Sequence, residues 1–492
     1  MTLIYQKGFA NAIYIVEAMF LLSERDMKHF SEECDNIMQK ADQERYKRLK
    51  PTLKDMWDII HTVRDFVIEK RRKIYGGFAL NKLIESVSPE KKFYDDDDVE
   101  KWDIDFYSPD PIADGIEITE RLYKKGYKYI VAGEALHEET YKIHAEMIDV
   151  ADITYMPSNI YNRVQFVAIE NMCLTHPHFM MIDYFRVITD PLTSYFRLEK
   201  TMGRLKLLAE SYPLPVIKHH NEKKGKKSDN HVMALDAVEK FIESNTSVVV
   251  VGTYAVNEMA KKVGCPGVPH EFYEIVSVDF LNDAPKLINA VRKEFGNAEL
   301  ITHAEFHPFF QYLGRSVAVS CDDKIVCKMY SNDERCVPFN TIKTNEKKNV
   351  QLGSYITVMM YNLINIIKAR CDNDTETKKT YMFHNSELMR YRNIHVTKKG
   401  GEIHDSSLFN YFVIRCVGET ALPKRRKQER IESNKAAGKR YVFRYEPRGG
   451  TPPQMAHQFK NSSGNVVRKP KDNVVVFDES ERAMIEEKKI DT

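Results

Sequence analysis

No apolar run in this chain approaches the ~18 consecutive residues that a membrane-spanning helix needs. The N-terminal apolar stretch Ala12 to Leu22 is interrupted by Glu17, and no small-residue cleavage pattern follows it. The eight cysteines form no CxxC pair and show no spacing typical of metal ligands. We therefore expect a soluble protein without a secretion signal, whose thiols are reduced in a cytosol-like compartment.

The chain also lacks a strong excess of charge of either sign. It has 73 basic and 71 acidic residues among 492, which gives a formal net charge of +2. A uniformly basic coat for nucleic acid is therefore excluded, and any such contact must come from a local patch. The hydrophobic fraction of 43% is enough for a sizeable core. At about 100 to 200 residues per domain, the length predicts two or three domains.

Residues 1 to about 70 have a helical pattern, and the chain then changes to a mixed α/β order. After Pro51, apolar residues recur at three- and four-residue steps on one helical face, namely Leu53, Met56, Trp57, Ile60, Val63 and Val67. A strand from Lys73 leads into a Gly-Gly turn and a helix, and later strands are expected over Trp102 to Phe106 and within Tyr141 to Tyr155. This order predicts an α/β (α+β) fold with added helices.

A second α/β unit repeats these landmarks further along the chain. Residues 252–257 match residues 76–81 at an offset of 176, and the first glycine, the alanine and the asparagine are retained. Later landmarks keep the same order at offsets of 174 and 176, with Ser277 opposite Asp103, Asp279 opposite Asp105 and Lys328 opposite Asp152. Three landmarks in one order predict two tandem units. Chance similarity between two short α/β units is the alternative.

Two carboxylates at i, i+2 are the strongest chemical signal in the first unit. Side chains alternate along a strand, so Asp103 and Asp105 project together while Ile104 points into the layer behind. Such a pair repels itself unless cations lie between, and Mg²⁺ prefers a few carboxylates plus triphosphate oxygens. Asp152 is the preferred third carboxylate, and Asp149 competes but lies where a hairpin turn is expected. A strand with one solvated polar face is the alternative.

The candidate phosphate contacts are backbone and basic groups around this pair. Gly76 and Gly77, between a strand and a helix, would let the backbone approach a phosphate at the positive helix end. Arg197, Lys200 and Arg204 share one face of a helical segment. They are either triphosphate or RNA contacts, or an ordinary exposed helix face.

A basic segment follows the second unit. Its candidate RNA contacts are Lys424, Arg425, Arg426, Lys427, Lys439 and Arg440, and aromatic residues alternate with the later cations. Basic charge with interleaved aromatics suits single-stranded nucleic acid, and a solubilising loop is the alternative. The polar run Lys218 to Asn230 predicts a linker. The expected domains are residues 1–215 with the catalytic unit, 231–448 with the second unit, and a flexible tail 449–492.

At these positions the chain resembles the poly(A) polymerase catalytic subunits of large cytoplasmic DNA viruses, the poxvirus, asfarvirus and mimivirus-type group. The Gly-Gly and Asp-x-Asp elements occur throughout the polymerase-β-like nucleotidyltransferase superfamily, whereas residues 189–200, from Thr-Asp-Pro to Glu-Lys, are more particular to the viral group. The likeness spans most of residues 70–340 and points to a giant-virus member. Phe78 departs from the superfamily motif, which often has a small hydroxyl residue after the glycines, and so does the long spacing of about 26 residues between glycines and aspartates.

The resemblance implies template-independent addition of AMP from ATP to an RNA 3′ end, with Asp103, Asp105 and Asp152 holding two Mg²⁺ or Mn²⁺ ions. ATP and a single-stranded RNA 3′ end are the implied partners; a homodimer or a processivity subunit is left open. The host cytoplasm, in the viral factory, is the implied location, with the virion as a further one and no membrane contact. Another terminal nucleotidyltransferase activity (uridylyl, CCA-type or oligoadenylate) and a non-catalytic RNA-binding subunit remain as alternatives.

The second unit is expected to be degenerate. Ser277 and Lys328 stand where the alignment places Asp103 and Asp152, so this unit cannot assemble a two-metal site. We expect Lys328 to pair with Asp279 and to replace the lost metal internally.

Overall fold

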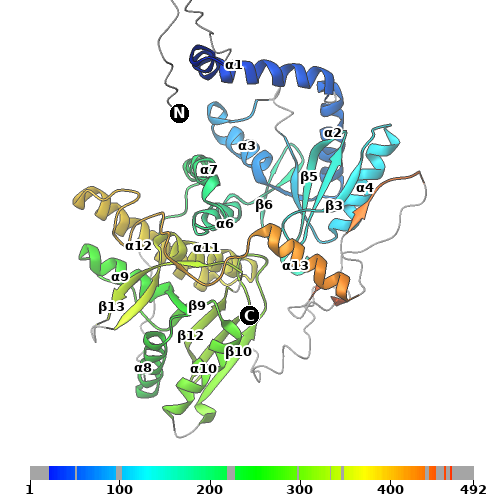
Figure 1. The fold of residues 1–492 in the computed structure, drawn as a ribbon. Helices are drawn as coiled ribbons and strands as arrows, with labels where there is room; N and C mark the ends of the chain where they lie inside the picture. The colour runs from blue at the N-terminus through cyan, green and yellow to red at the C-terminus, as the bar shows by residue number, and fades with distance from the viewer. Residues whose placement is uncertain are drawn as a thin grey trace, which may run out of the picture. The chain divides into compact units, whose positions relative to one another are not determined.

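The computed structural model describes residues 22–49, 52–95, 102–218, 228–295, 298–332, 334–344, 348–437 and 443–449, with two short strands at 459–460 and 466–467 (Figure 1). It divides into two compact units, Met1–Met56 and Trp57–Thr492. The first holds α1 (Glu24–Leu49), which begins at a reciprocal cap. The backbone N–H of Asp26 donates to Ser23 Oγ over 3.1 Å, and that of Ser23 donates to the Asp26 carboxylate over 2.8 Å.

Helix α2 (Leu53–Glu69) confirms the predicted apolar stripe, most of which lies in the larger unit. Its members Ile60, Val63 and Val67 are buried, whereas Leu53, at its start, is exposed. The ring of Phe66 packs against that of Phe106, with 6.2 Å between the centroids, and Trp57 packs against Trp102 at 5.3 Å. The helix therefore supports the sheet from behind the strand that carries the aspartate pair.

The first sheet has eight strands in the order β16-β3-β4-β5-β2-β1-β7-β6. Its elements are β1 (Lys73–Tyr75), α3 (Gly76–Val87), β2 (Asp105–Ser108), α4 (Pro111–Lys124), β3 (Val131–Glu134), β4 (Thr140–Ala145), β5 (Ile148–Tyr155), α5 (Ser158–Tyr161), β6 (Phe166–Ile169), β7 (Met172–Thr175), α6 (Pro177–Ile188), α7 (Leu198–Ser211) and the late strand β16 (Arg444–Tyr445). Helix α4 packs on one face, and α3 joins the sheet to α6 and α7.

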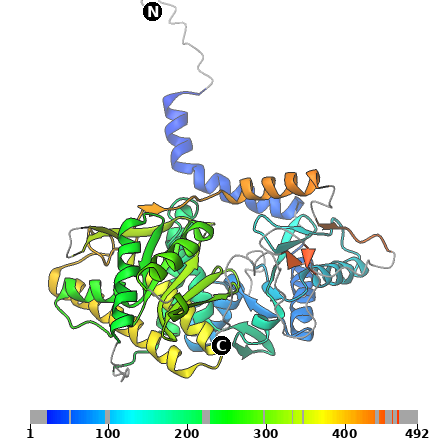
Figure 2. The ribbon, with the colours of Figure 1, turned by 90° about the horizontal axis from the view of Figure 1, so that it is seen from below.

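The second sheet also has eight strands, in the order β10-β11-β12-β9-β8-β14-β13-β15. Its elements are α8 (Asp229–Ser244), β8 (Val248–Val251), α9 (Gly252–Val263), β9 (Tyr273–Ser277), α10 (Phe280–Lys293), β10 (Ile301–Phe306), β11 (Ser316–Cys321), β12 (Lys324–Ser331), β13 (Val337–Lys343), β14 (Asn349–Gly353), α11 (Tyr355–Cys371), α12 (Thr375–Lys399) and β15 (Cys416–Val417). Helices α8 and α10 pack together on it, while α11 packs against α9 and α12. In Figure 2 the helices and strands of the second sheet, coloured green to yellow, are gathered in one group.

The two sheets share one topology, which confirms the predicted pair of tandem α/β units. Strands β3-β4-β5-β2-β1-β7 of the first correspond to β10-β11-β12-β9-β8-β14 of the second. In each unit the first two strands are antiparallel, β1 with β2 and β8 with β9. The last strand of the following three-stranded meander then pairs in parallel with the second strand of the unit, β5 with β2 and β12 with β9. Each glycine helix follows the first strand of its unit directly.

The strand registers correct the alignment of the two units. Tyr75 lies opposite Asp105, and Val251, its counterpart, lies opposite Glu274. Glu274 therefore occupies the position of Asp105, and the alignment that placed Asp279 there was wrong by five residues. Asp279 is instead the N-cap residue of α10, beyond the end of β9. The segment between the glycine helix and the following strand is shorter in the second unit, and the similar Val-Asp-Phe and Ile-Asp-Phe triplets concealed that difference.

The linker and the tail are only partly described. Residues 212–218 form neither helix nor strand, and the rest of the predicted linker, 219–227, lies outside the described residues, as does most of the tail. The domain boundaries stay a prediction. Helix α13 (Pro423–Ala436) follows the second sheet, and β16 then pairs with β3 of the first sheet. Among the described helices, none is long and apolar enough to cross a membrane.

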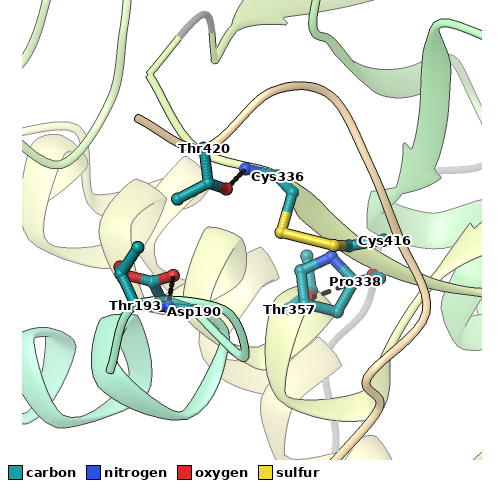
Figure 3. The surroundings of a disulfide bond; sticks show 7 residues. All are labelled: Asp190, Thr193, Cys336, Pro338, Thr357, Cys416 and Thr420. Atoms are coloured by element: carbon teal, nitrogen blue, oxygen red, sulfur yellow. Dashed lines mark hydrogen bonds between the residues drawn. A yellow bond between two sulfur atoms is a disulfide. The ribbon is translucent and has the colours of Figure 1, made fainter. Parts of the chain in front are cut away.

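Two cysteines form a disulfide, so the expectation of fully reduced thiols was wrong for them. Cys336 and Cys416 are bonded, with their Cα atoms 5.4 Å apart and a sequence separation of 80 residues (Figure 3). The bond joins the start of β13 to β15, where Pro338 lies opposite Cys416 in the register. Sequence spacing could not show this pair, because only the antiparallel pairing of β13 with β15 brings the two residues together.

Candidate active site

The structure brings Asp103, Asp105 and Asp152 to one face of the first sheet. The backbone N–H of Ile104 donates to Val150 O over 3.2 Å, so the strand pairing of β2 with β5 extends back past its first residue. The register of these parallel strands places Asp105 beside Asp152. Ile104 is fully buried while the three carboxylates are half-buried. The alternation expected from the sequence is thus present, and all three acids face one region.

Gly76 lets one of these carboxylates lie against the start of helix α3. Its φ is +75°, a left-handed conformation that favours glycine, and a Cβ atom at this position would overlap the carboxylate of Asp105. Tyr75, at the N-cap position, supplies no side-chain cap to the helix. The first-turn N–H groups of α3 are therefore free of a side-chain cap, which leaves an anion-binding helix end beside the aspartates.

The carboxylates perturb one another. Burial raises the pKa of Asp105 well above its usual value, and the charges of Asp103 and Asp152 raise it further, while Lys142 and Arg204 act in the opposite direction. Burial also raises the pKa of Asp152, against the lowering effect of Lys142. Negative charge is therefore concentrated here beyond what the neighbouring cations offset, and a divalent cation would relieve that repulsion.

Lys142 is a residue of this site that the sequence analysis missed. It lies opposite Asp152 in the β4–β5 register, and its Nζ is 3.4 Å from Asp152 Oδ1 and 2.7 Å from Asp149 Oδ2. A lysine on one strand and an aspartate on the next become neighbours only once the register is known. Lys142 is thus a built-in counter-charge for the third carboxylate.

Asp149 was expected in the hairpin turn, but the structure places it within β5. The turn consists of Glu146 and Met147, both with positive φ. An irregularity in the β4–β5 pairing sets Asp149 opposite His144, whose Nδ1 is 2.7 Å from Asp149 Oδ1. Asp149 is exposed and contacts Lys142 and His144, whereas Asp152 acts directly on Asp105. These contacts favour Asp152 as the third carboxylate.

Arg204 reaches the start of α3 from α7. Its guanidinium donates to the hydroxyl of Tyr94 over 2.7 Å and lies 5.1 Å above the ring of Phe93. A Cβ atom on Gly77 would lie 3.2 Å from Arg204 Nη2, so the guanidinium borders the glycine turn directly. Asn81 fixes this aromatic loop by accepting the backbone N–H groups of Phe93 and Tyr94 over 2.9 and 3.0 Å.

The helical segment predicted to carry Arg197, Lys200 and Arg204 is only partly continuous. Lys200 and Arg204 lie on α7, whereas Arg197 lies just before it. Helix α6 ends at Ile188, and Arg197 closes a short 3-10 turn before α7 begins. The side chains of Arg197 and Lys200 are exposed. The charge of Arg204, followed by burial and Arg197, lowers the pKa of Lys200, while Asp103 and Asp105 raise it. Lys200 therefore stands between the cationic face of α7 and the aspartates.

Three of the four described candidates in the basic segment make protein contacts. Arg426 forms an ion pair with Glu334 at 3.2 Å, and Lys427 donates to the carbonyl of Glu134 over 3.0 Å. Lys424 and Arg425 are exposed on α13, and Arg425 pairs with Glu429 along the helix. Lys439 and Arg440 lie outside the described residues. An RNA contact by this segment stays a prediction.

The second unit keeps the carboxylate but changes its surroundings. A Cβ on Gly252, whose φ is +62°, would overlap the buried carboxylate of Glu274, just as in the first unit. Glu274 Oε1 accepts from the hydroxyls of Tyr330 and Tyr381 over 2.6 and 2.7 Å. Tyr381 comes from α12, so this helix contributes a hydrogen bond to the carboxylate of the second unit.

The expected Lys328–Asp279 pair was wrong. Lys328 lies opposite Glu274 in the register of β12 with β9, at the position of Asp152, and its Nζ is 4.9 Å above the ring of Phe272. Burial lowers the pKa of Lys328, and Glu274 acts in the opposite direction. Asp279, five residues further along, accepts from Asn282 instead. An aromatic ring and an ammonium group thus replace two of the three carboxylates.

A divalent cation fits the first unit as a site that substrate completes. In the described part of the chain, no group of three or more His, Cys, Asp or Glu residues closes into a ready set of metal ligands. The three aspartates nevertheless share one face and repel one another. A partial carboxylate set that relies on phosphate oxygens is the usual arrangement for Mg²⁺ at nucleotide sites.

We expect replacement of Lys142 by methionine to lower the melting temperature of the metal-free protein, because Asp149 and Asp152 lose their counter-charge. The loss should amount to ~1 kcal/mol, since the pair is partly exposed. The stabilisation gained on adding Mg²⁺ should increase in the variant. Thermal unfolding with and without Mg²⁺ measures both. Lys125→Met is the control, because Lys125 pairs with Asp58 at 2.8 Å, away from the aspartates; an equal gain in both variants would contradict the prediction.

Comparisons with known proteins agree with this geometry. Residues 61–194 match the family described as "Poly(A) polymerase catalytic subunit", and residues 210–476 match "APMV, Putative poly(A) polymerase, catalytic subunit, C-terminal". The chain is 29% identical to a "Putative poly(A) polymerase catalytic subunit" of Acanthamoeba polyphaga mimivirus, over 89% of this chain and 82% of that protein. A protein of the same description from African swine fever virus is 29% identical over 32% of this chain and 34% of its own.

A solved structure supports the same assignment over nearly the whole chain. The crystal structure of the Megavirus polyadenylate synthase is similar with a TM-score of 0.80 and 30% sequence identity, covering 96% of this chain and 95% of that one. The resemblance to giant-virus proteins is thereby confirmed. The chain belongs to the viral poly(A) polymerase catalytic subunits and is a polynucleotide adenylyltransferase.

Proposed function

We propose that Asp103, Asp105 and Asp152 hold the catalytic divalent cations for transfer of AMP from ATP to an RNA 3′ end. The observation that carries this proposal is the shared face of the three carboxylates, where burial and then the charges of Asp103 and Asp152 raise the pKa of Asp105. Bound Mg²⁺ or Mn²⁺ ions would neutralise charge on the triphosphate and activate the attacking hydroxyl. ATP and single-stranded RNA are the substrates of this reaction.

Different residues of the chain position the triphosphate and the attacking 3′ hydroxyl. The uncapped start of α3 at Gly76 and Gly77 receives phosphate oxygens through backbone N–H groups. Arg204 and Lys200 supply positive charge for the triphosphate and the leaving pyrophosphate. Asp152, on the strand next to that of Asp105, lies closest to the attacking 3′ hydroxyl. The host cytoplasm, a homodimer and a processivity partner stay predictions.

Primer extension tests the proposal. A labelled oligoadenylate is incubated with each single nucleoside triphosphate and Mg²⁺ or Mn²⁺, and the product lengths are resolved. We expect lengthening with ATP and little with the other three nucleotides. Equal use of UTP or CTP would support another terminal nucleotidyltransferase activity. Absence of extension with every nucleotide and metal, in a protein that binds RNA, would overturn the proposal.

A further inference from the structure

Tyr94 lies at the edge of the glycine turn, beside Arg204. A Cβ atom added to Gly77 would lie 3.3 Å from the hydroxyl oxygen of Tyr94 and 3.2 Å from Nη2 of Arg204. Both separations are shorter than an ordinary van der Waals contact, so the two polar groups come this close only because Gly77 has no side chain. The sequence analysis selected Gly77 and Arg204 but missed Tyr94, whose place is set by tertiary contacts.

The hydroxyl of Tyr94 keeps a donor for a further partner. Arg204 Nη2 donates a hydrogen bond to its oxygen over 2.7 Å. That bond occupies a lone pair of the oxygen and leaves the hydroxyl proton unused. None of the described residues accepts a hydrogen bond from this proton, and the side chain is half-buried. The hydroxyl can therefore donate to a group that enters beside Gly77.

Uncharged groups hold Arg204 beside this hydroxyl. Its guanidinium lies 5.1 Å from the centre of the Phe93 ring and 5.8 Å from that of the Tyr94 ring. Within the described part of the chain, Arg204 forms no ion pair. Aromatic rings and a hydroxyl orient a guanidinium without neutralising it, so its charge and its remaining donors are available to an anion such as a phosphate.

The loop that carries Tyr94 is fixed to both α3 and α7. Asn81, on α3, accepts the backbone N–H groups of Phe93 and Tyr94 over 2.9 and 3.0 Å, and its Nδ2 donates to the carbonyl of Tyr94 over 3.2 Å. Earlier in the same loop, Lys91 Nζ lies 2.9 Å from Glu210 Oε2 near the end of α7. The position of the Tyr94 backbone is therefore set before any ligand arrives.

The second unit keeps the asparagine contact but not the aromatic loop. Asn257 Oδ1 accepts the backbone N–H of Val268 over 2.7 Å, and its Nδ2 donates to the carbonyl of Val268 over 2.9 Å. Val268 is buried and has neither a ring nor a hydroxyl. The asparagine contact is therefore common to the fold of both units, whereas the tyrosine–arginine pair lies in the unit that carries the three aspartates.

We propose that Tyr94 is a further binding residue for the triphosphate of ATP: its hydroxyl proton donates to a phosphate oxygen while its oxygen holds Arg204 at the glycine turn. This inference rests on the proposed function, because it assumes that a triphosphate lies at the start of α3. Phosphate oxygens accept hydrogen bonds from hydroxyl and guanidinium donors alike. The adjacent Gly76 meets the carboxylate of Asp105, which places the pair beside the metal-binding acids and favours the triphosphate over the RNA backbone.

The test measures triphosphate binding without catalysis. Isothermal titration calorimetry with inorganic tripolyphosphate, in Mg²⁺ and without primer, is carried out on the native chain and on Tyr94→Phe. We expect the variant to bind about tenfold more weakly at unchanged stoichiometry, because a hydrogen bond to a charged ligand is lost. In primer extension the KM for ATP should rise by a similar factor while kcat changes much less, since the contact is made to substrate and transition state alike.

Three comparisons separate a phosphate contact from a structural role. Lys91→Met is the matched control, because it removes the other contact between this loop and α7 and leaves Tyr94 in place; it should bind tripolyphosphate as the native chain does. The affinity for adenosine, which has no phosphate, should be the same in Tyr94→Phe and the native chain. In an Arg204→Met background, Tyr94→Phe should weaken tripolyphosphate binding by a smaller factor, because Tyr94 acts partly through that guanidinium.

Each other result overturns the inference. Unchanged affinity of Tyr94→Phe for tripolyphosphate, or weaker binding with a reduced stoichiometry, would exclude a phosphate contact by the hydroxyl. Equal weakening in Lys91→Met or for adenosine would reduce the loop to a structural element, and an equal factor in both backgrounds would separate Tyr94 from Arg204. If the native chain extends no primer but Tyr94→Phe still binds tripolyphosphate more weakly, the proposed function fails while the phosphate contact stands.

Discussion

Replacing Asp105 with asparagine is expected to reduce primer extension by about a thousandfold, the effect of losing ~4 kcal/mol of transition-state stabilisation. The amide keeps the size of the side chain but cannot supply the negative charge that a divalent cation needs. Rates are compared per folded molecule, at saturating ATP and primer. The matched control is Glu274→Gln, the same neutralisation at the corresponding position of the second unit, which should leave the rate unchanged.

The same substitution is expected to raise the melting temperature of the metal-free protein. In the native chain, burial and the charges of Asp103 and Asp152 raise the pKa of Asp105, so its ionised form is disfavoured in the fold. The neutral amide removes that repulsion, and opposite changes in stability and activity are typical of residues retained for function. Added Mg²⁺ should stabilise the native chain more than the variant. Near-native activity of Asp105→Asn, or a lowered melting temperature in EDTA, would contradict the metal-site assignment.

Replacing Gly76 with alanine is expected to abolish activity and to destabilise the fold together. The φ of +75° costs a non-glycine residue about 1–2 kcal/mol, and the new Cβ must displace the carboxylate of Asp105. The loss of activity should therefore match that of Asp105→Asn, although no charge is removed. Primer extension per folded molecule, with the folded fraction taken from urea unfolding, measures the two effects separately.

Gly252→Ala provides the control for this prediction. Gly252 has φ of +62° and meets the carboxylate of Glu274 in the same way, so a similar loss of stability is expected. The catalytic rate per folded molecule should stay near that of the native chain, because the second unit lacks the other two carboxylates. A similar loss of rate in both variants would show that the second unit takes part in catalysis, or that the effect is a general loss of structure.

Local pattern predicted the parts of the site that lie on one strand or turn. The alternation around Ile104 placed Asp103 and Asp105 on one face, and the repeat of the glycine turn predicted two units with one topology. These features depend only on residues close together in sequence. The choice of Asp152 over Asp149 also agrees with the contacts in the structure, although the reason given, a turn at Asp149, was wrong.

Features that depend on pairing between distant segments could not be predicted in the same way. The alignment of Asp279 with Asp105 was wrong because the loop before the strand differs in length between the units, and only the hydrogen-bond register reveals Glu274. Lys142 lies at the site through its place opposite Asp152. The disulfide joins Cys336 and Cys416 across 80 residues. In each case the relevant distance is set by the tertiary fold.

Strand β16 has a consequence for any attempt to separate the two halves of the chain. It covers β3, the strand that would otherwise end the first sheet, and the hydroxyl of Tyr445 donates to Glu120 on α4. A protein truncated before residue 443 would expose the backbone N–H and C=O groups of β3, a template on which strands of other molecules can add. The catalytic half therefore depends on residues synthesised after the entire second sheet, and expressing it alone invites aggregation.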